Sequence, residues 1–82
     1  MATTNVPRSS LLLDGYLLHS QQNAREFADS LDLNPRSVQK WRKGGSIPKL
    51  RAAVAMHDVS DGFIDLRGWL DEVKDPRKPG RR

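Results

Sequence analysis

Residues 24–41, AREFADSLDLNPRSVQKW, decide the fold expected for this 82-residue chain. Two apolar stripes recur there at helical spacing, with Phe27, Ala28 and Leu31 in the first and Val38 and Trp41 in the second. Leu33 falls in the short connection between them. The pattern predicts two short helices joined by a tight turn, and the small Ala28 suits a place where steeply crossing helices approach closely.

Start and stop signals bracket both helices. Asn23 can cap the first helix, and Glu26 three residues later completes a pattern like a capping box. Asn34 can cap the second helix, with Pro35 at its first position, where a missing N–H costs nothing. The Gly44–Gly45 pair is typical of a helix C-terminus. The second helix is therefore expected over residues 35–43.

Charge is distributed unevenly along the chain, although the net charge is only +4. Residues 34–57 hold six basic residues and no acidic one, whereas residues 58–75 hold six acidic residues and two basic ones. Residues 76–82 add four more positive charges. A cationic block that coincides with a predicted helix and has acidic flanks indicates a directed surface for a polyanion.

In a helix-turn-helix, two helices pack against each other through apolar residues, and the second helix presents a polar and cationic face to the major groove of DNA. The predicted pair of helices has both features. Arg36 can donate two hydrogen bonds to guanine, and Gln39 can pair in the same way with adenine. The residues predicted to contact bases are Pro35, Arg36, Ser37, Gln39 and Lys40. The residues predicted to contact phosphates are Gln22, Asn23, Arg42, Lys43 and Lys49.

The rest of the chain predicts a flexible lead over residues 1–8, a DNA-binding domain over residues 9–75 and a disordered basic tail over residues 76–82. A first helix is expected from a Ser9 or Ser10 cap to His19, and a fourth from Ile47–Pro48. A fifth amphipathic helix is expected to mediate self-association through Phe63, Leu66, Trp69, Leu70 and Val73. Val59–Leu66 is the one candidate for a strand, and helix is favoured there.

Residues 22–50, QNAREFADSLDLNPRSVQKWRKGGSIPKL, resemble the DNA-binding segment of phage regulators of the lambda Cro and CII type. As in CII, a Trp and a basic pair close the second helix, and Ile47–Pro48–Lys49 opens the next one. Asp32 stands where the family usually has a Gly at the turn. The resemblance implies a small all-α, lambda repressor-like or CII-like domain of about five helices. It also implies a transcription regulator acting as a homodimer or homotetramer, with RNA polymerase as a further partner.

Other classes of function lack support in the sequence. The chain has no Cys, and its two histidines, His19 and His57, are far apart. Asp58, Asp61 and Asp65 suit a helix start better than a metal site. We therefore expect no enzyme, no cofactor, no metal and no small-molecule substrate. The apolar run at residues 11–13 is too short for a signal peptide or a membrane span, so a cytoplasmic protein is expected.

Two alternatives remain at this level. A protein-binding module, such as an antitoxin or an inhibitor, would use the acidic fifth helix and would not bind duplex DNA. An architectural DNA factor of the excisionase type would bend DNA without a strict palindrome. The basic tail is either a solubilising end or a second phosphate contact.

Overall fold

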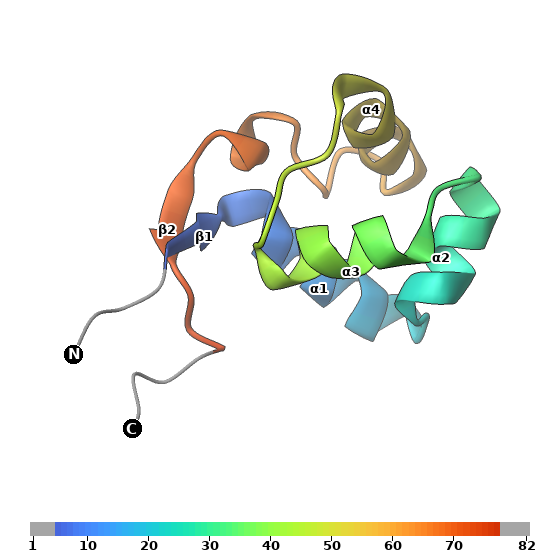
Figure 1. Cartoon of the computed structure of the whole chain (residues 1–82), viewed down its shortest axis with the longest axis horizontal. Helices are drawn as coiled ribbons and strands as arrows, with labels where there is room; N and C mark the ends of the chain where they lie inside the picture. The colour runs from blue at the N-terminus through green and yellow to red at the C-terminus, as the bar shows by residue number, and fades with distance from the viewer. Residues whose placement is uncertain (1–4, 78–82) are drawn as a thin grey trace.

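The computed structural model describes residues 5–77, which form a mostly helical domain with a small two-stranded sheet (Figure 1). The elements of this part of the chain are, in order, β1 (Asn5–Pro7), α1 (Arg8–Ser20), α2 (Ala24–Leu31), α3 (Pro35–Lys43), α4 (Leu50–Val59), the 3-10 helix η1 (Arg67–Trp69) and β2 (Glu72–Lys74). The predicted bounds of α2 and α3 are confirmed.

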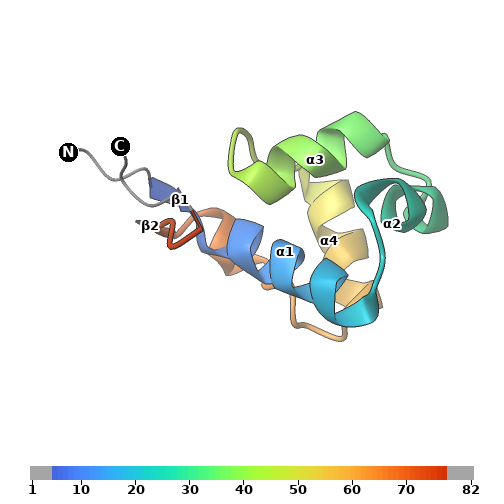
Figure 2. The same cartoon turned by 90° about the horizontal axis from the view of Figure 1, so that it is seen from below.

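The apolar faces of α1, α2, α3 and α4 pack against one another and form the core. α3 packs on both α1 and α2, and it lies along the upper edge of the domain in Figure 2. Residues from every helix contribute to the core, which comprises Leu13, Leu17, Ala24, Phe27, Ala28, Val38, Trp41, Ala52, Ala53, Met56, Ile64 and Trp69. Val38 and Ala28 are completely buried, as the two predicted stripes require.

The expected small, mostly helical domain is confirmed, but residues 5–77 contain four α-helices and a two-stranded sheet, and the predicted fifth helix does not form among them. The chain leaves α4 through Asp61 and Gly62, both in the left-handed region at φ of 56° and 86°. It then runs as a loop to η1, where Gly68 lies so close to Ser9 that a Cβ atom there would collide with its hydroxyl. The spacing of apolar residues in this segment reflects separate contacts of a loop with the core.

The predicted flexible lead contains β1 at Asn5–Pro7, and residues 1–4 of that lead lie outside the described residues. β1 and β2 pair antiparallel, with Asn5 opposite Lys74 and Pro7 opposite Glu72. Arg8 extends this closure, because its backbone N–H donates to the carbonyl of Asp71 at 2.7 Å. Strands of three residues are too short to show alternation, and their partners lie at opposite ends of the chain. Residues 5–8 therefore belong to the folded domain.

The Arg8 side chain also ties α1 to the segments on both sides of η1. Its guanidinium donates to the Asp65 carboxylate at 2.7 Å and to Asp71 at 3.1 Å. The hydrogen bond from Arg8 lowers the pKa of the Asp65 carboxyl below its ordinary value. The two predicted serine caps are wrong, because α1 begins at Arg8, and Ser9 and Ser10 are buried inside its first turn.

The start of α4 also differs from the prediction. The helix begins at Leu50 rather than at Ile47–Pro48, and Lys49 occupies its N-cap position without a side-chain cap. Its buried face is formed by Ala52, Ala53 and Met56, which leaves Leu50 exposed. Pro48 restricts the residue before it to an extended conformation, so the helix starts only after the proline.

Gly44 provides a test of the packing of β1 on the end of α3. It has a φ of 85°, and a Cβ atom there would collide with the side chain of Val6. We expect Gly44→Ala to lower the free energy of unfolding by more than about 2 kcal/mol. An alanine would be strained in the left-handed conformation and would also collide with Val6, and both effects destabilise the fold. Urea denaturation followed by circular dichroism measures the change.

Gly15 is the matched control for this substitution. It lies inside α1, and a Cβ atom there would meet nothing within 4 Å. Gly15→Ala should therefore raise the free energy of unfolding by about 0.5–1 kcal/mol, because alanine is the better helix former. A neutral Gly44→Ala would mean that β1 does not lie against the α3 terminus.

Candidate functional site

The turn between α2 and α3 sets the angle of the two helices. Asp32 adopts the left-handed conformation at φ 58° and ψ 44°, and its backbone N–H donates to the last turn of α2. The backbone N–H of Leu33 donates to the carbonyl of Ala28 at 2.8 Å. Asp32 thus performs the backbone role for which glycine is the usual residue.

Side-chain caps fix the start of both helices. Asn23 Oδ1 accepts from the backbone N–H of Glu26 at 2.8 Å, and Glu26 Oε1 accepts from the backbone N–H of Asn23 at 3.0 Å. The predicted capping box is therefore confirmed. Asn34 Oδ1 accepts from the backbone N–H of Arg36 at 2.8 Å, and Pro35 is the first residue of α3.

The outer face of α3 is cationic and open to solvent. Val38 and Trp41 are buried beneath the helix, with Trp41 only 8% exposed. Four side chains of α3 lie exposed on the opposite side, namely Arg36, Gln39, Lys40 and Lys43. Pro35 and Ser37 are half-buried at the margins of this face. We call Arg36, Gln39, Lys40 and Lys43 the outer face of α3 below.

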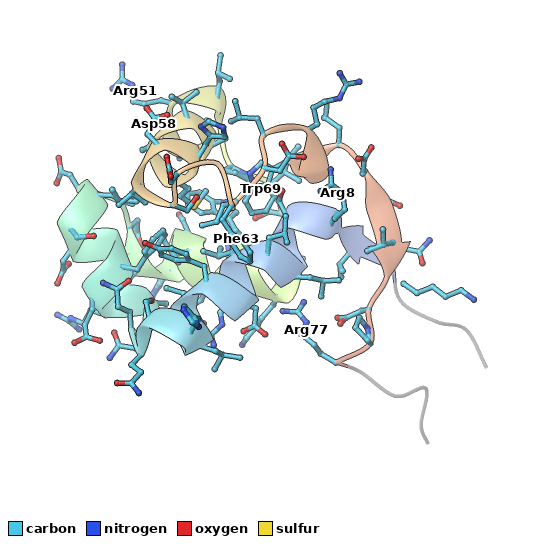
Figure 3. The ribbon with its side chains drawn as sticks, turned by 180° about the vertical axis from the view of Figure 1, so that it is seen from behind. Arg8, Arg51, Asp58, Phe63, Trp69 and Arg77 are labelled. Carbon is cyan, nitrogen blue, oxygen red and sulfur yellow. The ribbon has the colours of Figure 1, made fainter. Side chains whose placement is uncertain are left out.

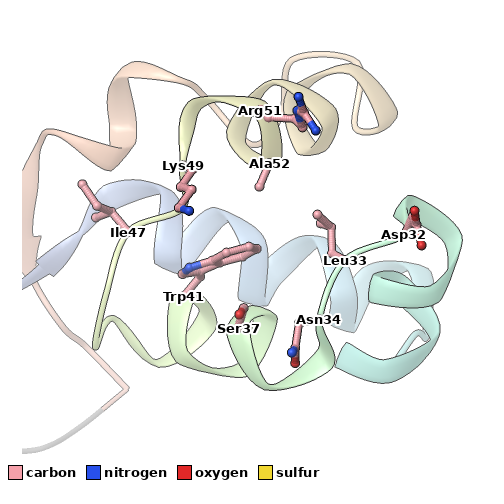
Figure 4. A pocket seen from close by; sticks show the side chains of 9 residues that line it. All are labelled: Asp32, Leu33, Asn34, Ser37, Trp41, Ile47, Lys49, Arg51 and Ala52. Carbon is pink, nitrogen blue, oxygen red and sulfur yellow. The ribbon is translucent and has the colours of Figure 1, made fainter.

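A groove of about 440 Å³ runs between α3 and α4, beside the outer face of α3 (Figure 4). Asn34, Ser37 and Trp41 line it from the α3 side, and Lys49 and Arg51 line it from the α4 side. Arg51 was not among the residues predicted for the site, although it belongs to the acid-free block of residues 34–57. Asp32 also lines the groove, but the two cations outnumber this carboxylate, so the lining has a net positive charge that suits an anionic group.

Arg42 is partly buried, whereas Lys40 and Lys43 on the same helix are exposed. Its Nε atom donates to Asp14 of α1 at 2.5 Å, and its side chain is 22% exposed. Arg77 lies next to the same carboxylate and donates to the backbone carbonyl of Arg42 at 2.7 Å. Arg42 is therefore held inside the domain, and we leave it out of the phosphate contacts proposed below.

Residues 76 and 77 were predicted to be part of a disordered tail, but Arg77 is half-buried and bound to the domain. Local sequence patterns contain no signal for this contact, because Asp14 and Arg77 lie 63 residues apart. Residues 78–82, the remainder of the predicted tail, lie outside the described residues.

Three of the five residues predicted for self-association, Leu66, Trp69 and Leu70, line one hollow, whereas Phe63 lies elsewhere. Trp69 is buried in the core, and Phe63 lies over α1, where its ring contacts Tyr16 at a centroid distance of 6.4 Å (Figure 3). Leu70 is exposed in a hollow that Leu66 and Trp69 also line, together with Ile47 and Leu50. The prediction of a single associating helix is wrong because that helix is absent from residues 5–77.

Within residues 5–77, no cluster of three or more histidine, aspartate or glutamate side chains is arranged to hold a metal ion. None of the helices in the same part of the chain has the length and apolar character needed to cross a lipid bilayer. Comparison with protein-family models, with curated proteins and with solved structures finds no match.

Asp32 allows the turn to be tested directly. Replacing Asp32 by glycine removes a Cβ atom from a left-handed residue, so Asp32→Gly should raise the free energy of unfolding by about 1 kcal/mol. Asp29→Gly is the control, because Asp29 is exposed within α2 and glycine there should cost about 0.3 kcal/mol relative to aspartate. If both variants lose stability to the same extent in thermal unfolding, the Asp32 backbone is not left-handed.

Proposed function

We propose that this chain is a sequence-specific double-stranded DNA-binding transcription regulator of the helix-turn-helix type, similar to phage Cro and CII. In this proposal α2 and α3 form the helix-turn-helix, and α3 lies in the major groove. The observation that carries the proposal is the exposed outer face of α3, which is cationic while Val38 and Trp41 fix the opposite face in the core. The absence of acidic residues from 34 to 57 keeps this surface attractive to a polyanion.

Base contacts are assigned to the exposed half of α3 and its first turn. Arg36 and Lys40 lie one helical turn apart, and Gln39 lies between them, so all three reach the same stretch of groove. Arg36 suits guanine O6 and N7, and Gln39 suits adenine N6 and N7. Pro35 and Ser37 contact base edges or the sugar at the margin of this set.

Phosphate contacts are assigned to residues at the start of α2 and to residues around the C-terminal end of α3. Lys43 lies at the C-terminal end of the outer face of α3, and Lys49 and Arg51 add cations at the groove between α3 and α4. Gln22 and Asn23 precede α2, whose first free backbone N–H groups favour an anion. Such contacts fix the position of α3 on the duplex without reading its sequence.

Occupation of a promoter by this domain would block or recruit RNA polymerase in a bacterial cytoplasm. The alternative of a protein-binding module depended on an acidic fifth helix, and residues 60–74 form a turn, a loop, η1 and β2 instead. An architectural factor would recover no paired half-sites in a selection from random oligonucleotides. We expect such a selection to recover two half-sites about 34 Å apart, which is one turn of DNA.

Substitutions of Arg36 and Lys43 distinguish contacts to bases from contacts to phosphates. On the selected site, Arg36→Ala should cost about 1–3 kcal/mol and relax the choice at one base pair. Lys43→Ala should weaken binding to all sequences and reduce the salt slope of log K by about 1. Fluorescence anisotropy titrations on selected and scrambled duplexes, at several salt concentrations, measure both effects.

Arg67→Ala is the matched control, because Arg67 is an exposed arginine of η1 and not of α3. It should change neither the affinity nor the sequence preference. If Arg67→Ala and Arg36→Ala weaken binding equally on both duplexes, only net charge matters and α3 does not read the sequence.

The proposed regulator acts as a homodimer, and we place the interface at the hollow between α4 and η1. Leu50 and Leu70 project from its edges with 76% and 79% of their surface exposed. Ile47 and Pro48 lie between them, next to the link that leaves α3. The same surface carries both the projecting leucines and a hollow. In two copies related by a twofold axis, the leucines of each copy can therefore insert into the hollow of the other.

Leu70→Ser and Leu50→Ser test this interface. Each should weaken self-association about tenfold or more, because a twofold axis places the substitution in both copies and two buried leucines are lost from the interface. Sedimentation equilibrium at several concentrations measures the dimer dissociation constant. Leu18→Ser is the control, because Leu18 is 65% exposed on α1, away from this hollow. An unchanged dimer in both test variants would place the interface elsewhere.

A further inference from the structure

The groove between α3 and α4 has an apolar floor. Leu33 belongs to the turn before α3, Trp41 belongs to α3, and Ala52 belongs to the first turn of α4. Figure 4 shows the Leu33 and Ala52 side chains entering the same space from opposite sides, with the Trp41 ring beside them. Trp41 and Ala52 are part of the core, so the packing of the domain holds this floor in place. A DNA phosphate is polar and would leave the floor unused.

The polar groups that line the groove have no partners in the part of the chain that the structure describes. Lys49 and Arg51 are exposed, and neither side chain forms a hydrogen bond or an ion pair within residues 5–77. The Ser37 hydroxyl on the α3 side likewise has no hydrogen-bond partner among these residues. Free cationic donors beside an apolar floor match a ligand that joins an anionic group to an apolar body.

Asp32 gives the groove a direction. It lies at the end next to α2, whereas Lys49 lies toward the link that leaves α3 (Figure 4). A ligand carboxylate is repelled by Asp32 and attracted by Lys49 and Arg51. The charged end of the ligand is therefore expected on the Lys49 side, with its apolar body over Leu33.

We propose that this groove binds a small flat anion of the aromatic carboxylate class, and that the bound anion weakens the binding of DNA. The groove volume of about 440 Å³ lies within the range of small-molecule sites. The proposal rests on the proposed function, in which Lys49 and Arg51 also contact phosphates. Because these two cations cannot bind both anions at once, ligand and duplex each lower the apparent affinity of the other.

Naphthoate is the probe for binding, because it joins a carboxylate to a flat apolar ring. Isothermal titration calorimetry compares it with naphthamide, which keeps the ring without the charge, and with acetate, which keeps the charge without the ring. We expect naphthoate to bind the full chain at least about tenfold more tightly than either. No binding of naphthoate, or equal binding of naphthoate and naphthamide, would overturn the proposal.

The two tryptophans report where naphthoate binds. Trp41 lines the groove between α3 and α4, and Trp69 lines the hollow between α4 and η1. In heteronuclear NMR spectra, naphthoate should shift the indole N–H peak of Trp41 and leave that of Trp69 in place. The Trp69→Phe variant assigns the two peaks. A shift of the Trp69 peak alone would place the probe in the other hollow, and the proposal would be wrong.

The Lys49→Gln/Arg51→Gln variant removes both cations of the groove and should weaken naphthoate binding about tenfold or more. Lys43→Gln/Arg67→Gln is the matched control, because both residues are exposed and neither lines the groove. The control should weaken duplex binding through Lys43 and leave naphthoate binding unchanged. An equal loss of naphthoate binding in both variants would mean that only net charge matters. Circular dichroism verifies that each variant is folded.

Asp32→Asn should have the opposite effect. Asparagine tolerates the left-handed conformation, so the turn is kept, and the loss of the carboxylate should tighten naphthoate binding about twofold to threefold. Asp29→Asn is the control, because Asp29 is exposed on α2 and does not line the groove. Equal tightening by both variants would place the anion outside the groove.

Competition is measured by fluorescence anisotropy with the selected duplex. At about ten times its own Kd, naphthoate should raise the apparent Kd of the duplex several-fold, with about elevenfold as the limit for complete exclusion. Acetate at the same concentration controls for ionic strength and should leave the apparent Kd unchanged. If naphthoate occupies the groove and the duplex binds as tightly as before, the proposed competition is refuted.

The outcomes separate this proposal from the proposed function. If the chain binds no duplex in the absence of naphthoate, the DNA-binding function fails, and calorimetry and the Trp41 peak still decide whether the groove binds the anion. If the chain binds the selected duplex and does not bind naphthoate, DNA binding stands and the ligand site is wrong.

Discussion

The left-handed turn at Asp32 and the hydrogen bond from Leu33 to Ala28 constrain the remainder of this domain. They fix the direction in which α3 leaves α2, and Val38 and Trp41 then fix its rotation. A rotation by one residue would bring charged side chains of α3 into the core, at a cost of several kcal/mol for each unpaired charge. The burial of two apolar residues and the exposure of the cationic face are therefore consequences of the same packing.

The two ends of the described chain support this corner from the opposite side. Val6 of β1 fills the space beside Gly44, immediately after α3, and β2 holds β1 in place. The ion pairs of Arg8 lie near the surface and contribute little individually, so the close packing of Val6 matters more. The C-terminal end of α3 is consequently braced by residues that are distant in the sequence, while its N-terminal end is fixed by the local Asn34 cap.

This difference explains which features could be predicted from the sequence. The capping box at Asn23, the start at Pro35 and the end at Gly44 depend on neighbouring residues, and all three were predicted correctly. The β1–β2 pairing and the contact of Arg77 with Asp14 depend on residues more than 60 positions apart, and periodicity contains no information about them. The helix expected from Phe63 to Val73 failed for a related reason, since apolar residues at helical spacing also occur in a loop that closes a core. The exposure of Arg36 and Lys40 followed directly from the predicted stripe, whereas the internal position of Arg42 required knowledge of Asp14.

The charges of α3 also affect its own stability. An isolated helix of nine residues is not stable in water, so α3 depends on the packing of Val38 and Trp41. Arg36 and Lys40 are like charges four residues apart, which costs about 0.2–0.5 kcal/mol in a helix. Lys40 and Lys43 lie in the last turn, where cations interact favourably with the helix dipole, and this gain offsets part of the repulsion. A polyanion against the outer face of α3 would remove the remaining repulsion, because each phosphate neutralises a cation. Since such a ligand binds only the folded domain, its binding would increase the stability of the same corner that forms the site.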